Sequence, residues 1–300
     1  MVLVTIDGVR WKEIFEGSDP TLSSGPPVAA SALAPNLYRL GSERGAFVGA
    51  PGRGTIAASG PNYISLPGYT EIFAGRPSMA CQRNDCSRTV LPTVLDEARS
   101  AGATVAAFSS WSTVELAVTA TPGTFPMSCG RKGGDAIDPS PGHGDYRPDR
   151  VTADFALTHF EVEKPDVFYL GLGDSDEYAH AGNYEGYIGA IKHADGVLGR
   201  LVSILDRMGE RGRRTHIFVT ADHGRADDWR NHGTMPEAAR VWMVAAGPHV
   251  RARGMVASLT ERRLSDIAPT MRRVMGLTPD ASERAGRPIE ELFTDNVPGL

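Results

Sequence analysis

The sequence has no long apolar run, no marked excess of positive charge and few cysteines. No stretch approaches the roughly eighteen consecutive apolar residues that a membrane-spanning helix needs, so we expect no membrane span. The formal net charge is -5, and basic residues gather only in short clusters such as Arg211-Gly212-Arg213-Arg214. A nucleic-acid polymer is therefore not an expected partner.

Three cysteines, Cys81, Cys86 and Cys129, allow at most one disulfide. A bond between Cys81 and Cys86 would close a small loop in a polar segment, which favours an oxidising compartment, periplasmic or extracellular. A cytoplasmic protein with reduced thiols is the alternative. The chain starts directly in the apolar run Val2–Ile6, so the sequence does not show whether a signal peptide was removed.

Hydrophobic residues make up 41% of the 300 residues and charged residues 22%, the balance of a globular protein with a large core. Apolar runs alternate with segments of helical spacing. This alternation predicts an α/β fold with a mostly parallel central sheet flanked by helices on both faces. The strand-like runs include Val2–Ile6, Thr104–Phe108, Pro165–Leu172 and His216–Thr220. We expect one domain over residues 1–300, with residues 111–150, rich in Gly and Pro, as a lid or insertion.

Several of these strands end on residues of the types that can bind metal ions. The candidates are Asp7, then Asp176 and His180 with Asp174 as a competitor, and finally Asp222, His223 and His232. Each could instead cap a turn, but independent caps at every strand end would be a strong coincidence. Asp176 and His180 are four residues apart, so one helical turn would place both on the same face. Hydrolytic sites with two metal ions need this inventory of ligands.

Ser65 is the candidate nucleophile, because it lies at or just before the start of a helix that Gly75 can end. A hydroxyl there meets the positive end of the helix dipole, which favours an alkoxide able to attack phosphorus or sulfur. The alternative is a helix-capping serine without a catalytic role. Thr70 is a second hydroxyl, but its position inside the helix pattern suits a nucleophile less well.

The ordered set of residues resembles the alkaline phosphatase superfamily, in particular its nucleotide pyrophosphatase/phosphodiesterase and cofactor-independent phosphoglycerate mutase branches. The shared order is an Asp-Gly after the first strand, a Ser or Thr at a helix start, Asp-x-x-x-His, Asp-His-Gly and a later His. This resemblance implies two divalent metal ions, zinc as first choice and manganese as second, since the ligands mix imidazole and carboxylate. By position, Asp7, Asp222, His223 and Ser65 would hold one ion, and Asp176, His180 and His232 the other.

The residues around Ser65 also resemble those of phosphodiesterases and sulfatases of this superfamily. In these enzymes a proline follows two residues after the nucleophile and a glycine ten residues after it, as Pro67 and Gly75 do here. Thr70 does not fit this spacing. Sulfatases further need an arginine four residues after the nucleophile, and Tyr69 occupies that position. The resemblance therefore argues against a sulfatase.

The activity that the resemblance implies is metal-dependent hydrolysis of a small phosphate monoester or diester through a phosphoseryl intermediate on Ser65. Asn84, nineteen residues after Ser65, and Arg76 would bind phosphoryl oxygens. His232 follows His223 by only nine residues, where the phosphodiesterases have a long insertion, so the chain would be a compact member. A phosphomutase or a sulfatase of the same superfamily is the alternative, and a metal-stabilised binding domain without catalysis is the alternative of another class.

Overall fold

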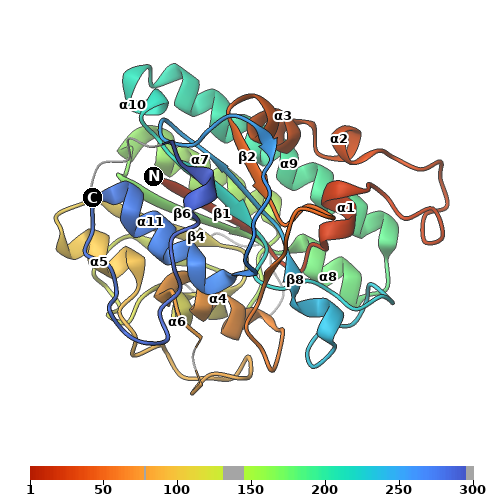
Figure 1. Cartoon of the computed structure of the whole chain (residues 1–300), viewed down its shortest axis with the longest axis horizontal. Helices are drawn as coiled ribbons and strands as arrows, with labels where there is room; N and C mark the ends of the chain where they lie inside the picture. Colours follow the sequence, from red (N-terminus) through yellow and green to blue (C-terminus); the bar gives the residue numbers. More distant parts are fainter. Residues whose placement is uncertain (78, 131–144, 295–300) are drawn as a thin grey trace.

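The computed structural model describes residues 1–77, 79–130 and 145–294, and its centre is an eight-stranded sheet (Figure 1). The strand order is β10-β2-β9-β7-β1-β6-β4-β5. Strand β9 runs antiparallel to both of its neighbours, and the other neighbouring strands are parallel. The predicted mostly parallel α/β sheet is therefore confirmed. The strands are β1 Val2–Ile6, β2 Gly45–Val48, β4 Val105–Ser109, β5 Met127–Cys129, β6 Val167–Leu172, β7 Ile217–Thr220, β9 Met243–Ala246 and β10 Gly254–Met255.

The three central strands β7, β1 and β6 set the position of the site. Every residue in them is buried, as expected for apolar parallel strands that are covered on both faces. Val2 pairs with Ile217 on one side and with Phe168 on the other, so the strands are in close register. Their carboxyl ends therefore meet at one edge of the sheet, where ligand sites of open α/β folds form.

Helices cover both faces of the sheet (Figure 1). On one face α3 and α7 each contact α9, and on the other α4 contacts α5, α6 and α11. The helices are α1 Trp11–Phe15, α2 Ala30–Leu33, α3 Pro35–Glu43, α4 Ser65–Ala74, α5 Val94–Ser100, α6 Glu115–Val118, α7 Asp149–Glu163, α8 Asp174–His180, α9 Tyr184–Arg207, α10 Glu210–Arg213 and α11 Ile267–Met275. Among the residues that the structure describes, no helix is long and apolar enough to cross a bilayer.

A small second sheet and the segment around residues 111–150 complete the fold. The second sheet joins β11 Arg262–Arg263, β3 Ile56–Ala57 and β8 Arg240–Val241, and Ile56 and Val241 in it belong to the same hydrophobic core as the main sheet. The lid or insertion over residues 111–150 stays a prediction; within that range α6 packs on α4, and β5 is an edge strand of the main sheet. Residues 131–144 of that insertion lie outside the described residues.

Candidate active site

The first ligand cluster lies where β1 and β7 end. The Nε2 atom of His223 is 3.4 Å from Oδ1 of Asp7 and 3.6 Å from Oδ2 of Asp222. All three side chains are buried. The backbone N–H of Gly8 donates to Oδ1 of Asp222 at 3.2 Å, whereas Oδ2 of Asp222 is buried without a hydrogen-bond partner. A buried carboxylate oxygen without a partner is costly, so this atom fits a ligand to a cation.

The second cluster consists of Asp176, His180 and His232. Asp176 and His180 share one face of α8, as their spacing predicts, and Oδ2 of Asp176 is 3.1 Å from Nε2 of His180. His232 arrives from the loop after β7, with its Nε2 3.1 Å from that of His180. One ligand atom from each of the three residues lies within 4.8 Å of the others, close enough to bind a single ion.

Backbone carbonyls orient two of these imidazoles. Nδ1 of His223 is 2.8 Å from the carbonyl oxygen of Gly224, and Nδ1 of His232 is 3.0 Å from that of Tyr63. A carbonyl can only accept, so each Nδ1 carries the proton and donates it, which leaves Nε2 available as a ligand. The two rings stack with centroids 4.2 Å apart, so the two clusters are adjacent.

Asp176 reaches both clusters, and Asp174 reaches neither. Asp176, Asp7 and His223 also place ligand atoms within 4.8 Å of one another, so distance alone does not assign Asp176 to one ion. Oδ1 of Asp174 instead accepts hydrogen bonds from the Tyr146 hydroxyl and from the backbone N–H of Asp149. Of the two competing carboxylates, the structure therefore favours Asp176 as the ligand.

The electrostatics of the site favour positive charge. Burial raises the pKa of Asp222 well above its usual range, and the neighbouring Asp7 raises it further. Burial alone would lower the pKa of His223, but the carboxylates of Asp222, Asp7 and Asp176 raise it to about 9. These carboxylates thus stabilise a positive charge at Nε2 of His223, which a divalent cation can supply in place of a proton.

Ser65 is the first residue of α4 and faces the first cluster. Its Oγ is 3.2 Å from Nε2 of His223 and 3.5 Å from Oδ1 of Asp7. Thr70 is buried in the same helix and its Oγ1 donates to the carbonyl oxygen of Leu66 at 2.8 Å, so its hydroxyl is already engaged. Of the two hydroxyls considered from the sequence, Ser65 is the one that the fold brings to the ligands.

Gly68 allows α4 to approach the first cluster. A Cβ atom on Gly68 would lie 2.2 Å from the carbonyl oxygen of Asp222, a distance that no side chain can occupy. We therefore expect Gly68→Ala to lower the free energy of unfolding by about 1–3 kcal/mol, measured by urea unfolding. Gly189→Ala in α9 is the matched control, because nothing lies within 4 Å of its added Cβ and an alanine there stabilises the helix by about 0.5–1 kcal/mol. Equal effects of the two substitutions would contradict a tight contact at Gly68.

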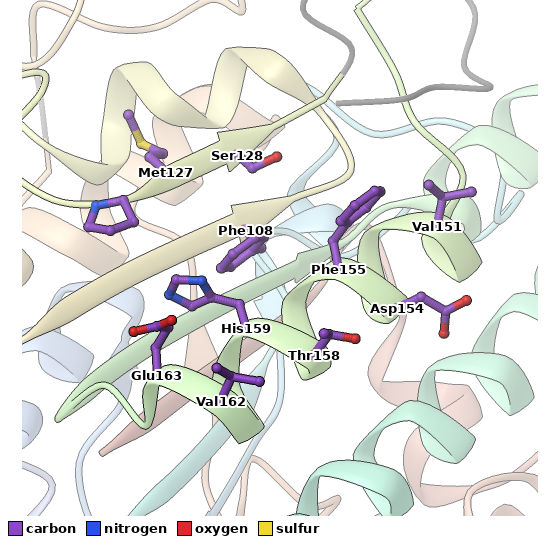
Figure 2. Close-up of a pocket in the computed structure, with 11 residues that line it drawn as sticks. Phe108, Met127, Ser128, Val151, Asp154, Phe155, Thr158, His159, Val162 and Glu163 are labelled. Atoms are coloured by element: carbon purple, nitrogen blue, oxygen red, sulfur yellow. The ribbon is translucent and has the colours of Figure 1, made fainter. Parts of the chain in front are cut away.

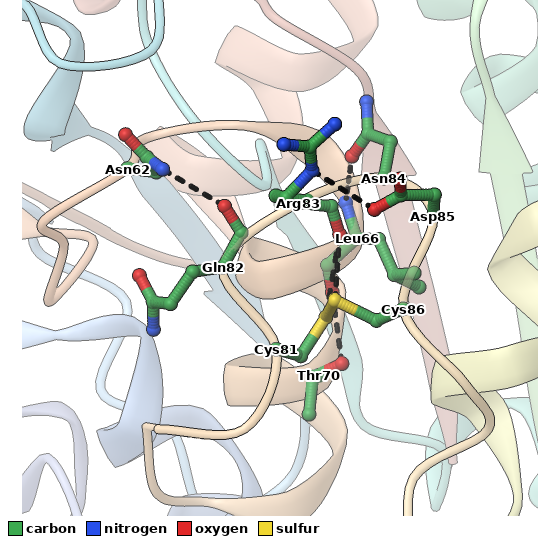
Figure 3. The surroundings of a disulfide bond; sticks show 9 residues. All are labelled: Asn62, Leu66, Thr70, Cys81, Gln82, Arg83, Asn84, Asp85 and Cys86. Carbon is green, nitrogen blue, oxygen red and sulfur yellow. Dashed lines mark hydrogen bonds and ion pairs between the residues drawn. A yellow bond between two sulfur atoms is a disulfide. The ribbon is translucent and has the colours of Figure 1, made fainter.

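Asn84 lies beside the start of α4, in a loop that a disulfide between Cys81 and Cys86 closes (Figure 3). Its Oδ1 accepts a hydrogen bond from the backbone N–H of Leu66 at 3.0 Å. The side-chain amide nitrogen therefore remains available to donate next to the nucleophile. Asn62 fixes the same loop, because its Nδ2 donates to the carbonyl oxygen of Gln82 at 2.8 Å.

Arg76 is not brought to the site. It follows the last turn of α4, so the helix rise separates it from Ser65 by roughly 16 Å along the axis. Its Nε is 3.8 Å from Oδ2 of Asp280 instead. Arg76 is therefore too far from Ser65 to bind a phosphoryl group attached there.

Two residues at the site were not anticipated from the sequence. The Tyr69 hydroxyl donates to Oδ2 of Asp7 at 2.9 Å, and burial raises the pKa of Tyr69 well above its usual range, so it stays a donor. Its position four residues after Ser65, on the same helix face, was an available signal. Arg225 contacts Asp176 from the loop after β7, and no pattern in the sequence indicated that contact.

A groove of about 730 Å³ lies elsewhere, between α7 and strands β4 and β5 (Figure 2). Its lining residues include the apolar Phe108, Met127, Phe155 and Val162 and the acidic Asp154 and Glu163. None of the candidate ligands or nucleophiles lines it. Although the groove is large, it is therefore not the candidate catalytic centre.

Comparison with known proteins adds sequence and fold relatives. Residues 146–279 match the family model described as "Metalloenzyme superfamily", a range that contains Asp176, His180, Asp222, His223 and His232. A 2,3-bisphosphoglycerate-independent phosphoglycerate mutase of Haloarcula marismortui is 32% identical over 46% of this chain and 26% of its own length. The chain thus matches about a quarter of that mutase.

Solved structures match almost the whole chain at low sequence identity. A putative sulfatase of Bacteroides thetaiotaomicron has a TM-score of 0.71 at 13% identity, with 99% of this chain and 75% of that chain covered. A murine ectonucleotide pyrophosphatase/phosphodiesterase has a TM-score of 0.64 at 12% identity, with 98% of this chain and all of that chain covered. At such identities the likeness shows a shared fold.

Proposed function

We propose that this chain, which belongs to the metalloenzyme superfamily of alkaline phosphatase-like proteins, hydrolyses small phosphate esters with Ser65 as the nucleophile. The single observation that carries this proposal is the position of the Ser65 hydroxyl. It lies at the N-terminus of a ten-residue helix, 3.2 Å from a ligand-type imidazole nitrogen, with two clusters of ligand residues beside it. A serine that only capped the helix would not need this set of carboxylates and imidazoles.

The residues fit two divalent cations. Divalent ions of this kind bind carboxylate oxygens and imidazole nitrogens. The site offers the unpartnered Oδ2 of Asp222 and the Nε2 atoms of His223 and His232, whose Nδ1 atoms are bonded to backbone carbonyls. Asp7, Asp222 and His223 with Ser65 would hold one ion, and Asp176, His180 and His232 the other. Bound there, the ions would supply the positive charge that lowers the pKa of a coordinated hydroxyl and stabilises phosphoryl oxygens. Zinc suits this mixture of imidazole and carboxylate best, and manganese is the alternative.

In the proposed reaction Oγ of Ser65 attacks phosphorus, the bond to the ester oxygen breaks, and the alcohol leaves as the phosphoseryl form is made. A water molecule then displaces the serine oxygen from phosphorus, which restores the hydroxyl and releases phosphate from a monoester substrate or a phosphate monoester from a diester. Tyr69 orients Asp7 through its hydrogen bond, and the amide nitrogen of Asn84 donates to a phosphoryl oxygen. The positive end of α4 stabilises negative charge at the same place.

A phosphomutase is the second candidate, because the curated relatives that match this chain carry that name. A mutase returns the phosphoryl group to its substrate, whereas a hydrolase passes it to water. A sulfatase would need an arginine four residues after the nucleophile, and Tyr69, which occupies that position, instead donates to Asp7.

One panel of substrates separates these activities. The purified protein, loaded with zinc or with manganese, is assayed on a phosphate monoester, a phosphate diester, a phosphonate ester, a sulfate ester and 2-phosphoglycerate. We expect release of the alcohol from a phosphate ester and no interconversion of phosphoglycerates. Interconversion without release of phosphate would replace the hydrolase by a mutase. Turnover of the sulfate ester alone would replace it by a sulfatase.

The disulfide supports a proposal for the compartment. Because disulfides persist in oxidising surroundings, the bond between Cys81 and Cys86 supports a periplasmic or extracellular location. The test is thiol labelling under denaturing conditions of protein isolated from its native source. Reduced thiols at Cys81 and Cys86 would contradict that location.

The disulfide loop also yields a prediction for Asn84. We expect Asn84→Ala to lower kcat/KM about 10²-fold, as the loss of one donor to a developing oxyanion does. Dithiothreitol converts the disulfide to two thiols and itself to a cyclic disulfide, and we expect it to lower kcat/KM of the parent. It should have little further effect on Asn84→Ala, since both changes act on the same amide. A reductant effect of equal size in both proteins would contradict this role of the loop.

A further inference from the structure

Arg225 is a buried guanidinium that lies between the segments carrying the ligands. Its side chain is 0% exposed. Nε donates to the carbonyl oxygen of Gly8 at 3.1 Å, and Nη1 donates to that of Arg230 at 2.6 Å. Nη2 donates to Oδ1 of Asp176 and, at 3.3 Å, to its backbone carbonyl oxygen. One side chain thus joins the end of β1, the start of α8 and the loop that leads to His232.

Because of this contact, the two carboxylate oxygens of Asp176 have different partners. Oδ2 faces His180 at 3.1 Å, whereas Oδ1 is bonded to Arg225 and lies 3.9 Å from Nε2 of His223. A cation that shared Oδ1 would lie against the guanidinium charge and be repelled by it. Asp176 can therefore serve the ion beside His180 through Oδ2, but not the ion beside His223 through Oδ1.

We infer that Arg225 is a positioning residue that reserves Asp176 for the ion held with His180 and His232. The ion at Asp7 and His223 then depends on the unpartnered Oδ2 of Asp222 to complete its carboxylate ligands. This inference rests on the two-ion site of the proposed function. It settles which ion Asp176 serves, a question that distances between ligand atoms leave open.

The surrounding residues make room for Arg225 and hold its partners. A Cβ atom on Gly8 would lie 2.5 Å from Oδ1 of Asp176 and 2.9 Å from Nη2 of Arg225, so only glycine leaves space for this contact. Gly8 also has φ of 62°, which glycine adopts without strain. In the loop after Arg225, the buried Trp229 has φ of 57° and packs edge-on against Tyr184, with ring centroids 5.0 Å apart.

A non-glycine residue with positive φ persists only where its surroundings hold it, so the loop conformation is fixed at two points. One is the Trp229 side chain, and the other is the bond from Arg225 to the carbonyl of Arg230, two residues before His232. Loss of Arg225 would therefore misplace two ligands of the same ion, Asp176 and His232. Lysine cannot replace it, because an ammonium lacks the planar fork that reaches three acceptors in different directions.

The test compares the affinities of the two sites for zinc. Apo-protein of the parent, Arg225→Lys and Arg225→Gln is titrated with zinc in competition with a chromophoric chelator, and His180→Ala identifies which affinity belongs to the ion beside His180. We expect both Arg225 variants to bind that ion 10- to 100-fold more weakly, the usual cost of losing a group that orients a ligand. The other affinity should change by less than about threefold, since its ligands keep their own hydrogen bonds.

Arg272→Lys is the matched control. Arg272 is also buried and bonded to a carboxylate and a carbonyl, those of Glu97 and Ala74, but it touches no candidate ligand. We expect it to leave both zinc affinities unchanged. Circular dichroism shows whether each variant is folded, and if Arg225→Gln unfolds, Arg225→Lys decides the result.

Equal weakening of both sites, or no weakening of either, would overturn the inference. Zinc binding is measured without substrate, so the outcome does not depend on the proposed reaction. A protein that shows the expected asymmetry but hydrolyses no phosphate ester refutes the proposed function alone. A protein that hydrolyses phosphate esters with both affinities insensitive to Arg225 refutes this inference alone.

Discussion

Replacing Ser65 by alanine will lower kcat on a phosphate ester by at least about 10³-fold, the scale of loss when a covalent nucleophile is removed. The reason is that Oγ of Ser65 is the hydroxyl next to both Asp7 and His223 at the start of α4. The measurement is single-turnover and steady-state release of p-nitrophenol from p-nitrophenyl phosphate and from its diester. A phosphoseryl form trapped by acid quench should appear in the parent and be absent from the variant.

Thr70→Val is the control for this experiment, because Thr70 is the other hydroxyl in the same helix and its Oγ1 is bonded to a backbone carbonyl. We expect kcat to change by less than about threefold, since the lost hydroxyl is bonded within its own helix to the carbonyl of Leu66. If Ser65→Ala hydrolysed both substrates as fast as the parent, Ser65 would lose its role, and a metal-stabilised domain without catalysis at this serine would be favoured.

Removing divalent metal with a chelator will abolish hydrolysis and lower the melting temperature. Without cations, the buried Asp222 and Asp7 carboxylates lie close together beside His223, and the pKa of Asp222 is already raised by burial and by Asp7. Ions that bind the folded chain stabilise it in proportion to the logarithm of their free concentration over Kd. Differential scanning calorimetry with and without zinc measures the shift, and elemental analysis should find about two metal ions per chain, as the two clusters imply.

Readdition of zinc or manganese shows which ion restores turnover. Ser65→Ala is a useful control here, because it should keep most of the rise in melting temperature on zinc binding while it lacks turnover. The two-ion site would be refuted by fewer than one transition-metal ion per chain together with turnover that a chelator does not change.

The sequence predicted those parts of the site that depend on local pattern. Val2–Ile6 reads as a buried strand because it is continuously apolar, and the next residue is therefore placed at the edge where parallel strands end. The helix from Ser65 was predicted because Gly75 can adopt positive φ, and it does so at 73°. The four-residue spacing of Asp176 and His180 predicted their shared helix face.

The remaining features depend on contacts between distant segments, which no local pattern encodes. Arg225 lies 49 residues from Asp176 along the chain, so their contact arises only from the packing of α8 against the loop after β7. For Arg76, closeness in sequence was a poor guide to closeness in space. It is close to Ser65 in sequence, but an intact helix carries it to the far end.

The unequal exposure of the two ligand clusters has a kinetic consequence. His223 and Asp222 are 0% exposed, whereas the His180 side chain is 49% exposed. His232 stacks on His223 from the more open side. An ion held by Asp7, Asp222 and His223 would therefore lie behind its neighbour and could leave only after that neighbour or the loop of His232 had moved. We expect the inner ion to exchange with solvent slowly and the outer ion quickly. The inner ion would therefore have to bind before the outer one.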